Sequence, residues 1–518
     1  MRAETVAACF AKSGHGAGTE GECVGSERAI RTGLRALPPI FWAVLLVGIA
    51  LRVAAFDPYT AHHPDESFQY LEQAHRLVFG YGLVPWEFRY FIRSWLIPLA
   101  LAGPMQIGEW LQPGGIAYLV LPRALVAAFN SVTIVAAWFI GARVSRQHAI
   151  VAMAVVAVWL ESVLFSVQTL SESMAVACFL PAAALLRSDA RLPSIALAGF
   201  LMAVSGLLRF QFAPAIAVYA ILIAGRDLRI WKGLLIGGIP VVIGGGAIDL
   251  AMGLSPYEWI ATNYQMNIGQ ERMRKIGGVS HSRYLIDMVR YWAFAAPFIL
   301  LLALLAGKAF RPLLIVALVN IVVHQLIGHK EWRYLWFSMQ ILLLLAAIGS
   351  VNLASMTLFG RRFAKPTGHG VTAGIIAVWG AASLLLATTD AYQLWWRTSG
   401  EPSRLAGFAG RDPRVCGLAA SRRENVEYGY AFVHRPIPLY LLGSKGLPSL
   451  SHPGEAAKSF NAIIVSSALA PPDGFPTRAA CGGEGGQRVC LFTRPGGCTP
   501  TAPGAAIEHQ AVLIKTDM

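Results

Sequence analysis

Two short polar motifs in an otherwise apolar chain contain the residue types that acid–base and phosphate chemistry require. Residues 62–72 read His-His-Pro-Asp-Glu-Ser-Phe-Gln-Tyr-Leu-Glu, and Asp65 and Glu66 are the candidate proton acceptors. Residues 328–334 read Gly-His-Lys-Glu-Trp-Arg-Tyr. Charged groups beside a membrane core are costly unless they are paired or functional. Lys330 and Arg333, with His329, would bind a phosphate at the depth of the lipid headgroups.

The first motif predicts a helix that begins at Pro64, since proline is favoured in the first helical turn. Spacings of four and seven residues would then put its polar side chains on one face and its apolar ones on another, suited to a membrane surface. The polar set is Asp65, Gln69 and Glu72, and the apolar set is Phe68, Leu71 and Val78. Acidic residues at a helix start also favour the helix dipole, so simple capping is the alternative for Asp65 and Glu66.

Each motif has a second alternative. Two histidines and a carboxylate in the first motif could hold a divalent metal, but the sequence lacks His-Glu-x-x-His, so a metal is not favoured. The second motif could be a basic anchor with an aromatic belt, which does not account for Glu331. Glu172, Arg209, Asp249 and residues 263–267 are further polar candidates that we expect near the same face.

The composition indicates a membrane protein with many spans. Of 518 residues, 55% are hydrophobic and 14% are charged, and the mean hydropathy is +0.52; a soluble protein has about 25% charged residues. The net charge of +14 comes mostly from basic residues at the ends of apolar runs. We therefore expect a lipid bilayer, and no nucleic acid, as the partner of this charge.

Apolar runs and basic loop ends predict eleven transmembrane helices and three regions. The expected spans are 38–56, 118–141, 150–168, 173–186, 193–208, 212–225, 233–251, 291–306, 313–327, 335–353 and 371–388. Residues 1–37 would be a disordered cytoplasmic segment, 38–388 the transmembrane domain with an outer loop at 57–115, and 389–518 an outer domain. The segment 94–110 is expected to lie at the interface or to be re-entrant, because a further span would invert the charge pattern downstream.

The C-terminal region predicts a small α/β or β-rich domain with short strands at 462–466 and 488–493. Its four cysteines, Cys416, Cys481, Cys490 and Cys498, predict disulfides with three connectivities open. Zinc is the alternative, but no Cys-x-x-Cys pair is present.

The motifs together resemble those of glycosyltransferase family 22, which contains the mannosyltransferases of N-glycan and GPI-anchor assembly. The resemblance runs from about residue 52 to 345 and rests on His-Pro-Asp-Glu at 63–66, Gly-Tyr-Gly-Leu-Val-Pro-Trp-Glu at 80–87, Arg-Ser at 93–94 and the motif at 329–334. Trp332 stands where the family has an acid, and Pro85 where it often has threonine.

The resemblance implies an all-α GT-C membrane fold and an inverting glycosyltransferase, with mannose as the expected sugar. The donor would be a polyprenyl (dolichyl-type) phosphate-linked sugar, and the acceptor a glycan or glycolipid. Asp65 would be the catalytic base with Glu66 as its partner or alternate, and His329, Lys330 and Arg333 would bind the donor phosphate. Supporting or substrate-binding positions are His63, Gln69, Glu72, Trp86, Glu87, Arg93, Glu172 and Glu331.

Two other functions remain open at this point. The chain could be a polyprenyl-lipid carrier or transporter without transferase activity, although no internal repeat is seen. It could also be a GT-C enzyme that modifies lipid A or another envelope glycan with a different sugar. The preference for arginine over lysine favours a bacterial inner membrane with the site facing the periplasm; in a eukaryote the same topology would place it in the ER lumen.

Overall fold

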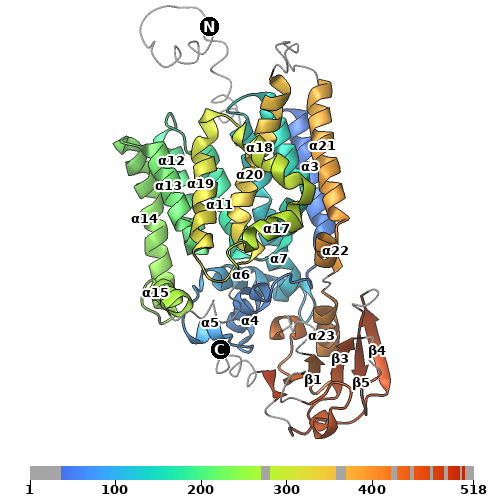
Figure 1. The fold of residues 1–518 in the computed structure, drawn as a ribbon. Helices are drawn as coiled ribbons and strands as arrows, with labels where there is room; N and C mark the ends of the chain where they lie inside the picture. The colour runs from blue at the N-terminus through green and yellow to red at the C-terminus, as the bar shows by residue number, and fades with distance from the viewer. Residues whose placement is uncertain are drawn as a thin grey trace, which may run out of the picture.

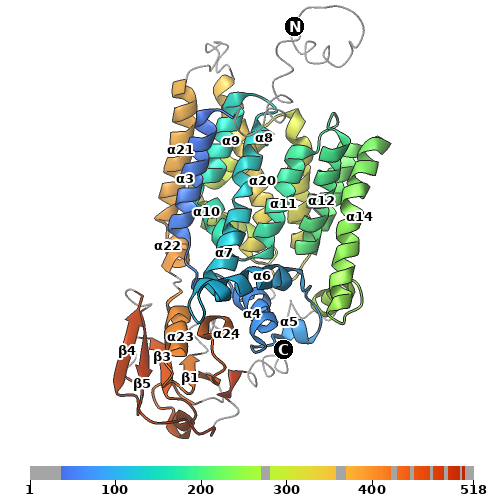
Figure 2. The same ribbon diagram turned by 180° about the vertical axis from the view of Figure 1, so that it is seen from behind.

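A helical bundle carries a small mixed α/β domain at one end (Figures 1 and 2). The computed structural model describes residues 37–269, 280–356, 369–397, 400–421, 429–443, 448–466, 471–483, 488–501 and 505–507. Residues 1–36, which hold nearly all of the predicted cytoplasmic segment, lie outside the described part of the chain.

Apolar helices of the bundle coincide with all eleven predicted spans. Within the described ranges, six segments are long and apolar enough to cross a membrane: Ala117–Gly141, Leu228–Ala251, Arg283–Leu304, Lys308–Gln325, Trp332–Ser355 and Gly370–Ala387. The bent pair Arg146–Val158 and Leu160–Val167 is a seventh when the two helices are counted as one span, and four shorter apolar helices are Pro39–Ala55, Ser171–Leu185, Leu192–Leu208 and Phe210–Ala224. The protein is therefore a multi-pass membrane protein.

The individual helices of the bundle divide some of these segments. They are α3 (Pro39–Ala55), α7 (Ala117–Asn130), α8 (Val132–Gly141), α9 (Arg146–Val158), α10 (Leu160–Val167), α11 (Ser171–Leu185), α12 (Leu192–Leu208), α13 (Ala213–Ala224), α14 (Leu228–Ala251), α17 (Arg283–Trp292), α18 (Ala296–Leu304), α19 (Arg311–Gln325), α20 (Trp336–Ser355) and α21 (His369–Ala387).

A buried arginine compensates for the 60° bend between α9 and α10. The break frees backbone carbonyls that a membrane interior cannot hydrate. The Arg52 guanidinium from α3 donates to the carbonyls of Ala157 at 2.9 Å, Val156 at 3.1 Å and Ser162 at 3.2 Å. Arg52 thus has a structural role, holding the bent span against α3.

The outer loop between α3 and α7 folds into short helices below the bundle. A π-helix, Glu66–Leu71, runs into α4 (Glu72–Phe79), and α5 (Trp86–Arg89) and α6 (Leu96–Leu111) follow. Figure 2 shows α6 lying across the lower end of the bundle. This orientation agrees with the interface position predicted for 94–110. Two further helices at this end are α15 (Glu258–Tyr264) and α22 (Asp390–Arg397).

The C-terminal domain contains a five-stranded mixed sheet in the order β2-β1-β3-β5-β4. Its elements are α23 (Glu401–Arg411), β1 (Leu418–Ser421), α24 (Tyr430–Val433), β2 (Leu439–Leu442), β3 (Ala462–Ser466), β4 (Thr477–Gly482) and β5 (Val489–Thr493). The strands β1, β2 and β3 are parallel, and β5 is antiparallel to both β3 and β4. Both predicted strands are therefore present, at β3 and β5.

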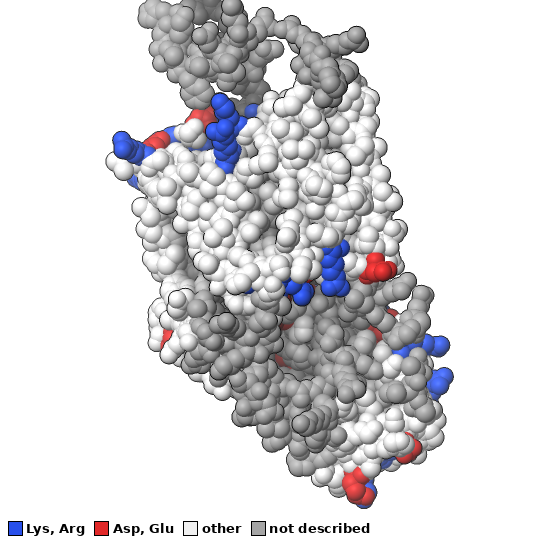
Figure 3. All heavy atoms as spheres, viewed as in Figure 1, with Lys and Arg blue, Asp and Glu red and all other residues white. Residues whose placement is uncertain are grey.

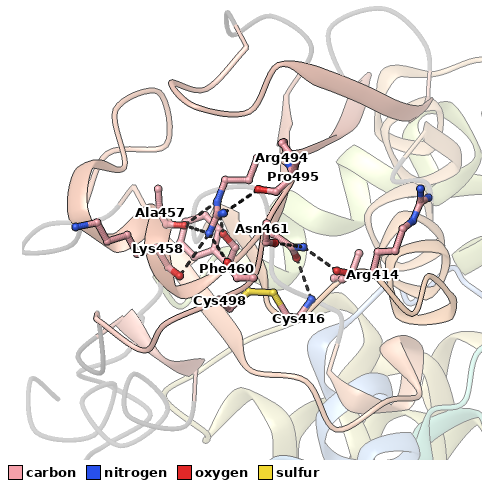
Figure 4. Close-up of a disulfide and its surroundings, with 12 residues drawn as sticks. Arg414, Cys416, Ala457, Lys458, Phe460, Asn461, Arg494, Pro495 and Cys498 are labelled. Atoms are coloured by element: carbon pink, nitrogen blue, oxygen red, sulfur yellow. Dashed lines mark hydrogen bonds between the residues drawn. A yellow bond between two sulfur atoms is a disulfide. The ribbon is translucent and has the colours of Figure 1, made fainter.

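Two disulfides confirm the prediction for the four cysteines and fix their connectivity. Cys416 pairs with Cys498, and Cys481 pairs with Cys490 across β4 and β5. Around the first bond, the Asn461 amide donates to the Arg414 carbonyl at 2.8 Å and accepts from the Cys416 backbone at 2.9 Å (Figure 4). This bond joins the segment before β1 to the chain after β5.

The charged side chains on the face in Figure 3 lie at two levels, with an uncharged band between them. Basic groups gather at the end away from the C-terminal domain, and charges of both signs lie at the other end. A band of this kind is expected where helices face lipid. The outer loop and the C-terminal domain share one end of the bundle (Figure 2).

Candidate active site

An ion pair joins the two sequence motifs. Arg333, in the turn before α20, donates from Nη2 to Oδ2 of Asp65 at 2.8 Å, across 268 residues of sequence. The Asp65 side chain is 13% exposed and that of Arg333 is 8% exposed. The outer loop and the turn before α20 therefore build one site. Asp65 is more exposed than Glu87, the other outer-loop acid near Arg93.

Arg333 also contacts two further carboxylates. Its Nη1 lies 3.2 Å from Oε1 of Glu172, at the start of α11, and its Nε lies 2.5 Å from Oε2 of Glu331. Arg209 approaches the same Glu172 oxygen at 3.3 Å, and both guanidiniums lie about 5 Å from the centre of the Tyr334 ring. The network brings Glu172 and Arg209 into the site predicted from the motifs.

Two histidines complete the cluster around Glu331. His63 Nε2 lies 3.2 Å from Oε2 of Glu331, and His63 Nδ1 lies 3.4 Å from Oδ1 of Asp65. His329 Nε2 lies 2.6 Å from Oε1 of Glu331, which also accepts from the Tyr334 hydroxyl at 3.2 Å. His63 therefore bridges the candidate base and the second motif.

A cavity of about 250 Å³ opens beside this network. Its lining includes His63, Glu331 and Arg333 from the network. The other lining residues are His62, Phe165, Gln168, Leu170, Arg290, Tyr291, Trp332 and Ala391. The charged network thus borders a space in which a small polar group can bind.

The network sets the protonation of the outer-loop groups. Burial favours the neutral acid, but the Arg333 guanidinium, with His63 and Arg93, holds the pKa of Asp65 well below its usual range. Burial and Arg333 oppose protonation of His63, yet the carboxylates of Asp65 and Glu331 outweigh them and raise its pKa to about 9. Asp65 is therefore a carboxylate, and His63 an imidazolium, at neutral pH.

A second layer of predicted residues surrounds Asp65. Gln69 donates to Glu87 Oε1 at 2.9 Å, and Arg93 is close enough to interact electrostatically with both Asp65 and Glu87. Burial, reinforced by the charge of Asp65, raises the pKa of Glu87 to about 7. Trp86 and Glu87 are the first two residues of α5.

Glu66 follows Asp65 but is held by backbone N–H groups and by Arg123 rather than by Arg333. It is fully buried, and it accepts the backbone N–H groups of His62 at 2.9 Å and Thr169 at 2.7 Å. The Arg123 guanidinium from α7 lies 3.6 Å from Oε2 of Glu66. The contacts of Glu66 connect the outer loop to the bundle.

The prediction of one polar face for Asp65, Gln69 and Glu72 is wrong. The chain forms a π-helix over Glu66–Leu71, which adds residues to each turn and rotates Glu72 away from Asp65. The expected membrane-facing apolar set is wrong as well. Leu71 is buried, and Phe68 and Val78 pack against the apolar cluster shared with the C-terminal domain.

Glu72 instead lies at the junction with the C-terminal domain. It is fully buried, and its carboxylate accepts the backbone N–H groups of Leu83 at 2.6 Å, Tyr430 at 3.2 Å and Ala431 at 2.8 Å. Burial is the largest influence on it and raises its pKa to about 7. The partner α24 is thereby fixed to α4.

Lys330 lies beside the network without joining it. Its ammonium donates to the Ile327 carbonyl at 2.9 Å, and its side chain is covered. Among the residues that the structure describes, Lys330 is not part of the cavity lining. In the same described ranges, no group of three or more His, Cys, Asp or Glu side chains has an arrangement that could hold a metal ion.

Sequence reasoning missed two features of the site. Glu161, at the start of α10, is buried and accepts the indole N–H groups of Trp159, Trp292 and Trp332 at 3.1, 2.6 and 2.7 Å. Its position within a predicted span was a usable signal, because ionisable residues in membranes are seldom placed without a partner. Arg290 at the cavity had no such signal, since it looked like an ordinary loop end.

Known proteins match the N-terminal part of the chain. Residues 40–243 match the Alg9-like mannosyltransferase family. GPI mannosyltransferase 3 of Drosophila melanogaster is 44% identical over 92 residues, which are 17% of this chain and 16% of that protein. Human GPI alpha-1,2-mannosyltransferase 3 is 36% identical over 91 residues, again 17% of this chain and 16% of the relative. The matched stretch thus spans about a sixth of these relatives.

Solved structures match over most of the chain. ArnT from Cupriavidus metallidurans bound to undecaprenyl phosphate has a TM-score of 0.55 at 13% identity, covering 90% of this chain and 100% of that one. The apo structure of the same protein has a TM-score of 0.51 at 14% identity, covering 87% and 97%. These likenesses confirm the predicted GT-C fold, and the similarity of residues 40–243 to the Alg9-like mannosyltransferase family agrees with the resemblance seen in the motifs.

Proposed function

We propose that this protein is an inverting mannosyltransferase that takes its sugar from a polyprenyl-phosphate donor and passes it to a glycan or glycolipid at the outer membrane face. The observation that carries the proposal is the Asp65–Arg333 ion pair, which brings the two motifs together beside a cavity. The family match supports mannose as the sugar. Undecaprenyl phosphate bound to ArnT, a protein of similar fold, supports a polyprenyl donor.

The proposed reaction combines proton transfer to a base, formation of the glycosidic bond and departure of the phosphate. The acceptor hydroxyl loses its proton to Asp65 and forms a bond with the anomeric carbon of the sugar. The bond between that carbon and the phosphate oxygen breaks on the opposite face, and the electron pair leaves with the phosphate. Arg333 stabilises the charge that develops on the departing phosphate. Because the hydroxyl attacks the face opposite the phosphate, the anomeric configuration inverts in a single displacement.

The ion pair also suggests how the base becomes active. A carboxylate held by Arg333 is a weak proton acceptor because its pKa lies well below the usual range. A donor phosphate entering the cavity competes with Asp65 for the same guanidinium and so weakens this hold. Donor binding would thereby raise the basicity of Asp65 only when a sugar is in place to react.

The disulfides indicate which side of the membrane the site faces. The outer loop, the C-terminal domain and the disulfides all lie at one end of the bundle (Figure 2). Disulfides form and persist in oxidising compartments. We therefore assign this end to the periplasm in a bacterium, or to the ER lumen in a eukaryote.

A transfer assay tests the function. Purified protein in nanodiscs is given polyprenyl-phosphate mannose and a panel of lipid-linked glycan acceptors, and the product anomer is determined by NMR. The expected result is a mannosylated acceptor of inverted configuration and free polyprenyl phosphate. Transfer of a different sugar would contradict the mannose assignment, and lipid movement across the bilayer without transfer would support a carrier.

A further inference from the structure

We propose that Arg290 contacts the donor phosphate and that the apolar groove beside it holds the first isoprene units of the polyprenyl chain. This inference rests on the proposed function and deepens it, because it assigns residues to the two chemically different parts of one donor. In this assignment Arg290, and not Lys330, is the second cation that binds the phosphate.

The charge balance of the cavity favours Arg290. The cavity is lined by two guanidiniums, those of Arg290 and Arg333. Arg333 is held by three carboxylates. Arg290 is exposed, with its guanidinium 5.6 Å from the centre of the Tyr291 ring. Among the residues described, no carboxylate lies within ion-pair distance of Arg290. An entering phosphate can therefore bind Arg290 without displacing a carboxylate from it.

The reaction itself calls for a second cation. The donor is a phosphodiester with one negative charge, whereas the leaving group is a phosphate monoester that carries about −1.5 to −2 at neutral pH. Donors aimed at charge that develops during the reaction lower the barrier most. A second guanidinium therefore contributes to binding of the donor and contributes more as the phosphate departs.

An apolar groove of about 710 Å³ lies along α18, α20 and α21. It begins at Phe294 and Ala295, which closely follow the cavity residues Arg290 and Tyr291 in the chain. The segment α21–α22 also contributes to both spaces, because Ala382 lines the groove and Ala391 lines the cavity. The two chain segments α17–α18 and α21–α22 thus border both spaces.

The chemistry of the groove suits an isoprenoid. Its lining is almost wholly apolar, and several of its side chains, such as Phe298 at 62% and Val378 at 70% exposure, are open to the lipid phase. Phe294 follows Arg290 by four residues, so an isoprenoid attached to a phosphate at Arg290 would enter the groove at this end. The groove would then hold its initial units while the remainder extends into the bilayer.

The phosphate contact is tested by direct binding of undecaprenyl phosphate to the full-length protein in nanodiscs. Loss of a charged hydrogen-bonding group predicts about 10- to 100-fold weaker binding for Arg290→Ala, with Arg290→Lys restoring part of the loss. Lys308→Ala is the matched control, because it removes an exposed cation in the short helix Lys308–Phe310, which follows the far end of α18. Unchanged binding by Arg290→Ala would overturn the proposal.

The groove is tested by its dependence on chain length. Gly374 lines the groove and Gly380 does not, and a β-carbon at either position of α21 meets nothing within 4 Å. We expect Gly374→Leu to weaken binding of undecaprenyl phosphate about tenfold by filling the groove, without affecting a two-isoprene phosphate. Gly380→Leu should bind both normally. Equal chain-length dependence in all three proteins would mean that ordinary membrane lipid fills the groove.

Failure of this inference differs from failure of the proposed function. If the wild-type protein transfers mannose while Arg290→Ala binds the lipid phosphate normally, the transferase assignment stands and the Arg290 site is wrong. If binding depends on Arg290 but no sugar is transferred to any acceptor, the lipid-phosphate site stands and the mannosyltransferase function is wrong.

Discussion

Asp65 and Glu72 are acids of one outer loop, seven residues apart, yet their surroundings differ in kind. Asp65 is paired with side-chain cations next to a cavity. Glu72 is fully buried and bound by backbone N–H groups from Leu83, Tyr430 and Ala431. Side-chain cations can exchange one anion for another, whereas backbone donors are fixed by the fold. The first arrangement suits a reaction, and the second suits the docking of two domains.

The largest expected effect separates these two roles. Asp65→Asn keeps the shape of the side chain and removes the proton acceptor, so turnover should fall by about 10²–10⁴-fold with donor binding largely intact. The measurement is single-turnover mannose transfer, with thermal unfolding as a check of the fold. Near-normal turnover in Asp65→Asn together with an inactive Glu66→Gln would reverse the roles assigned to the two acids.

Glu72→Gln should do the opposite, lowering stability more than chemistry. The amide replaces one carboxylate oxygen by an N–H donor facing another donor, which leaves a buried N–H unpaired at a cost of about 1–3 kcal/mol. We expect faster proteolysis at the junction of the C-terminal domain. A loss of turnover as large as that of Asp65→Asn, in protein with an intact junction, would contradict the distinction drawn between these acids.

The pH dependence of the Glu72 junction follows from its raised pKa of about 7. The folded state holds this proton more tightly than the unfolded chain, whose glutamate has a pKa near 4.5. The resulting stabilisation is complete below about pH 4.5 and is lost as the pH rises through about 7. Unfolding curves of the wild-type protein should show this change, and those of Glu72→Gln should show a smaller one, because Glu87 has a pKa raised to about 7 as well.

How much of this could be predicted depended on which features are local in sequence. Apolar runs and basic loop ends predicted the spans, because burial in lipid acts on each segment separately. The partner of Asp65 was foreseen only as a family motif, since 268 residues separate it from Arg333. The π-helix over Glu66–Leu71 was not predicted, because the spacing of polar and apolar residues was interpreted with the 3.6-residue period of an ordinary α-helix.

The pH dependence of His63 tests the role of the side-chain cations around Asp65. Its pKa of about 9 means that the folded protein binds this proton more tightly than an unfolded histidine at 6.5. The stabilisation is present in full below about pH 6.5 and is lost as the pH rises through about 9. If the imidazolium orients Asp65 and Glu331, activity should fall about tenfold per pH unit above 9. His63→Gln should lack this decline and be less active at pH 7.

Tyr118→Phe should give the smallest effect, confined to the Glu72 end. The Tyr118 hydroxyl donates to the Ala431 carbonyl at 2.8 Å, while Glu72 accepts from the N–H of the same residue. The ring of Tyr118 also stacks on His434, with centroids 3.8 Å apart, and phenylalanine preserves this contact. Removing the hydroxyl alone should therefore cost about 0.5–1.5 kcal/mol of stability and leave mannose transfer unchanged.

A double-mutant cycle shows whether the two groups hold Ala431 together. Once Glu72→Gln has loosened the N–H side, the hydroxyl of Tyr118 has a less fixed carbonyl to bind, so the second substitution should cost less than it does alone. Additive losses would mean that α24 is held by the apolar cluster around Phe432 rather than by these polar contacts. A matching cycle between Tyr118→Phe and Asp65→Asn should be additive, because these two side chains share no hydrogen-bond partner among the described residues.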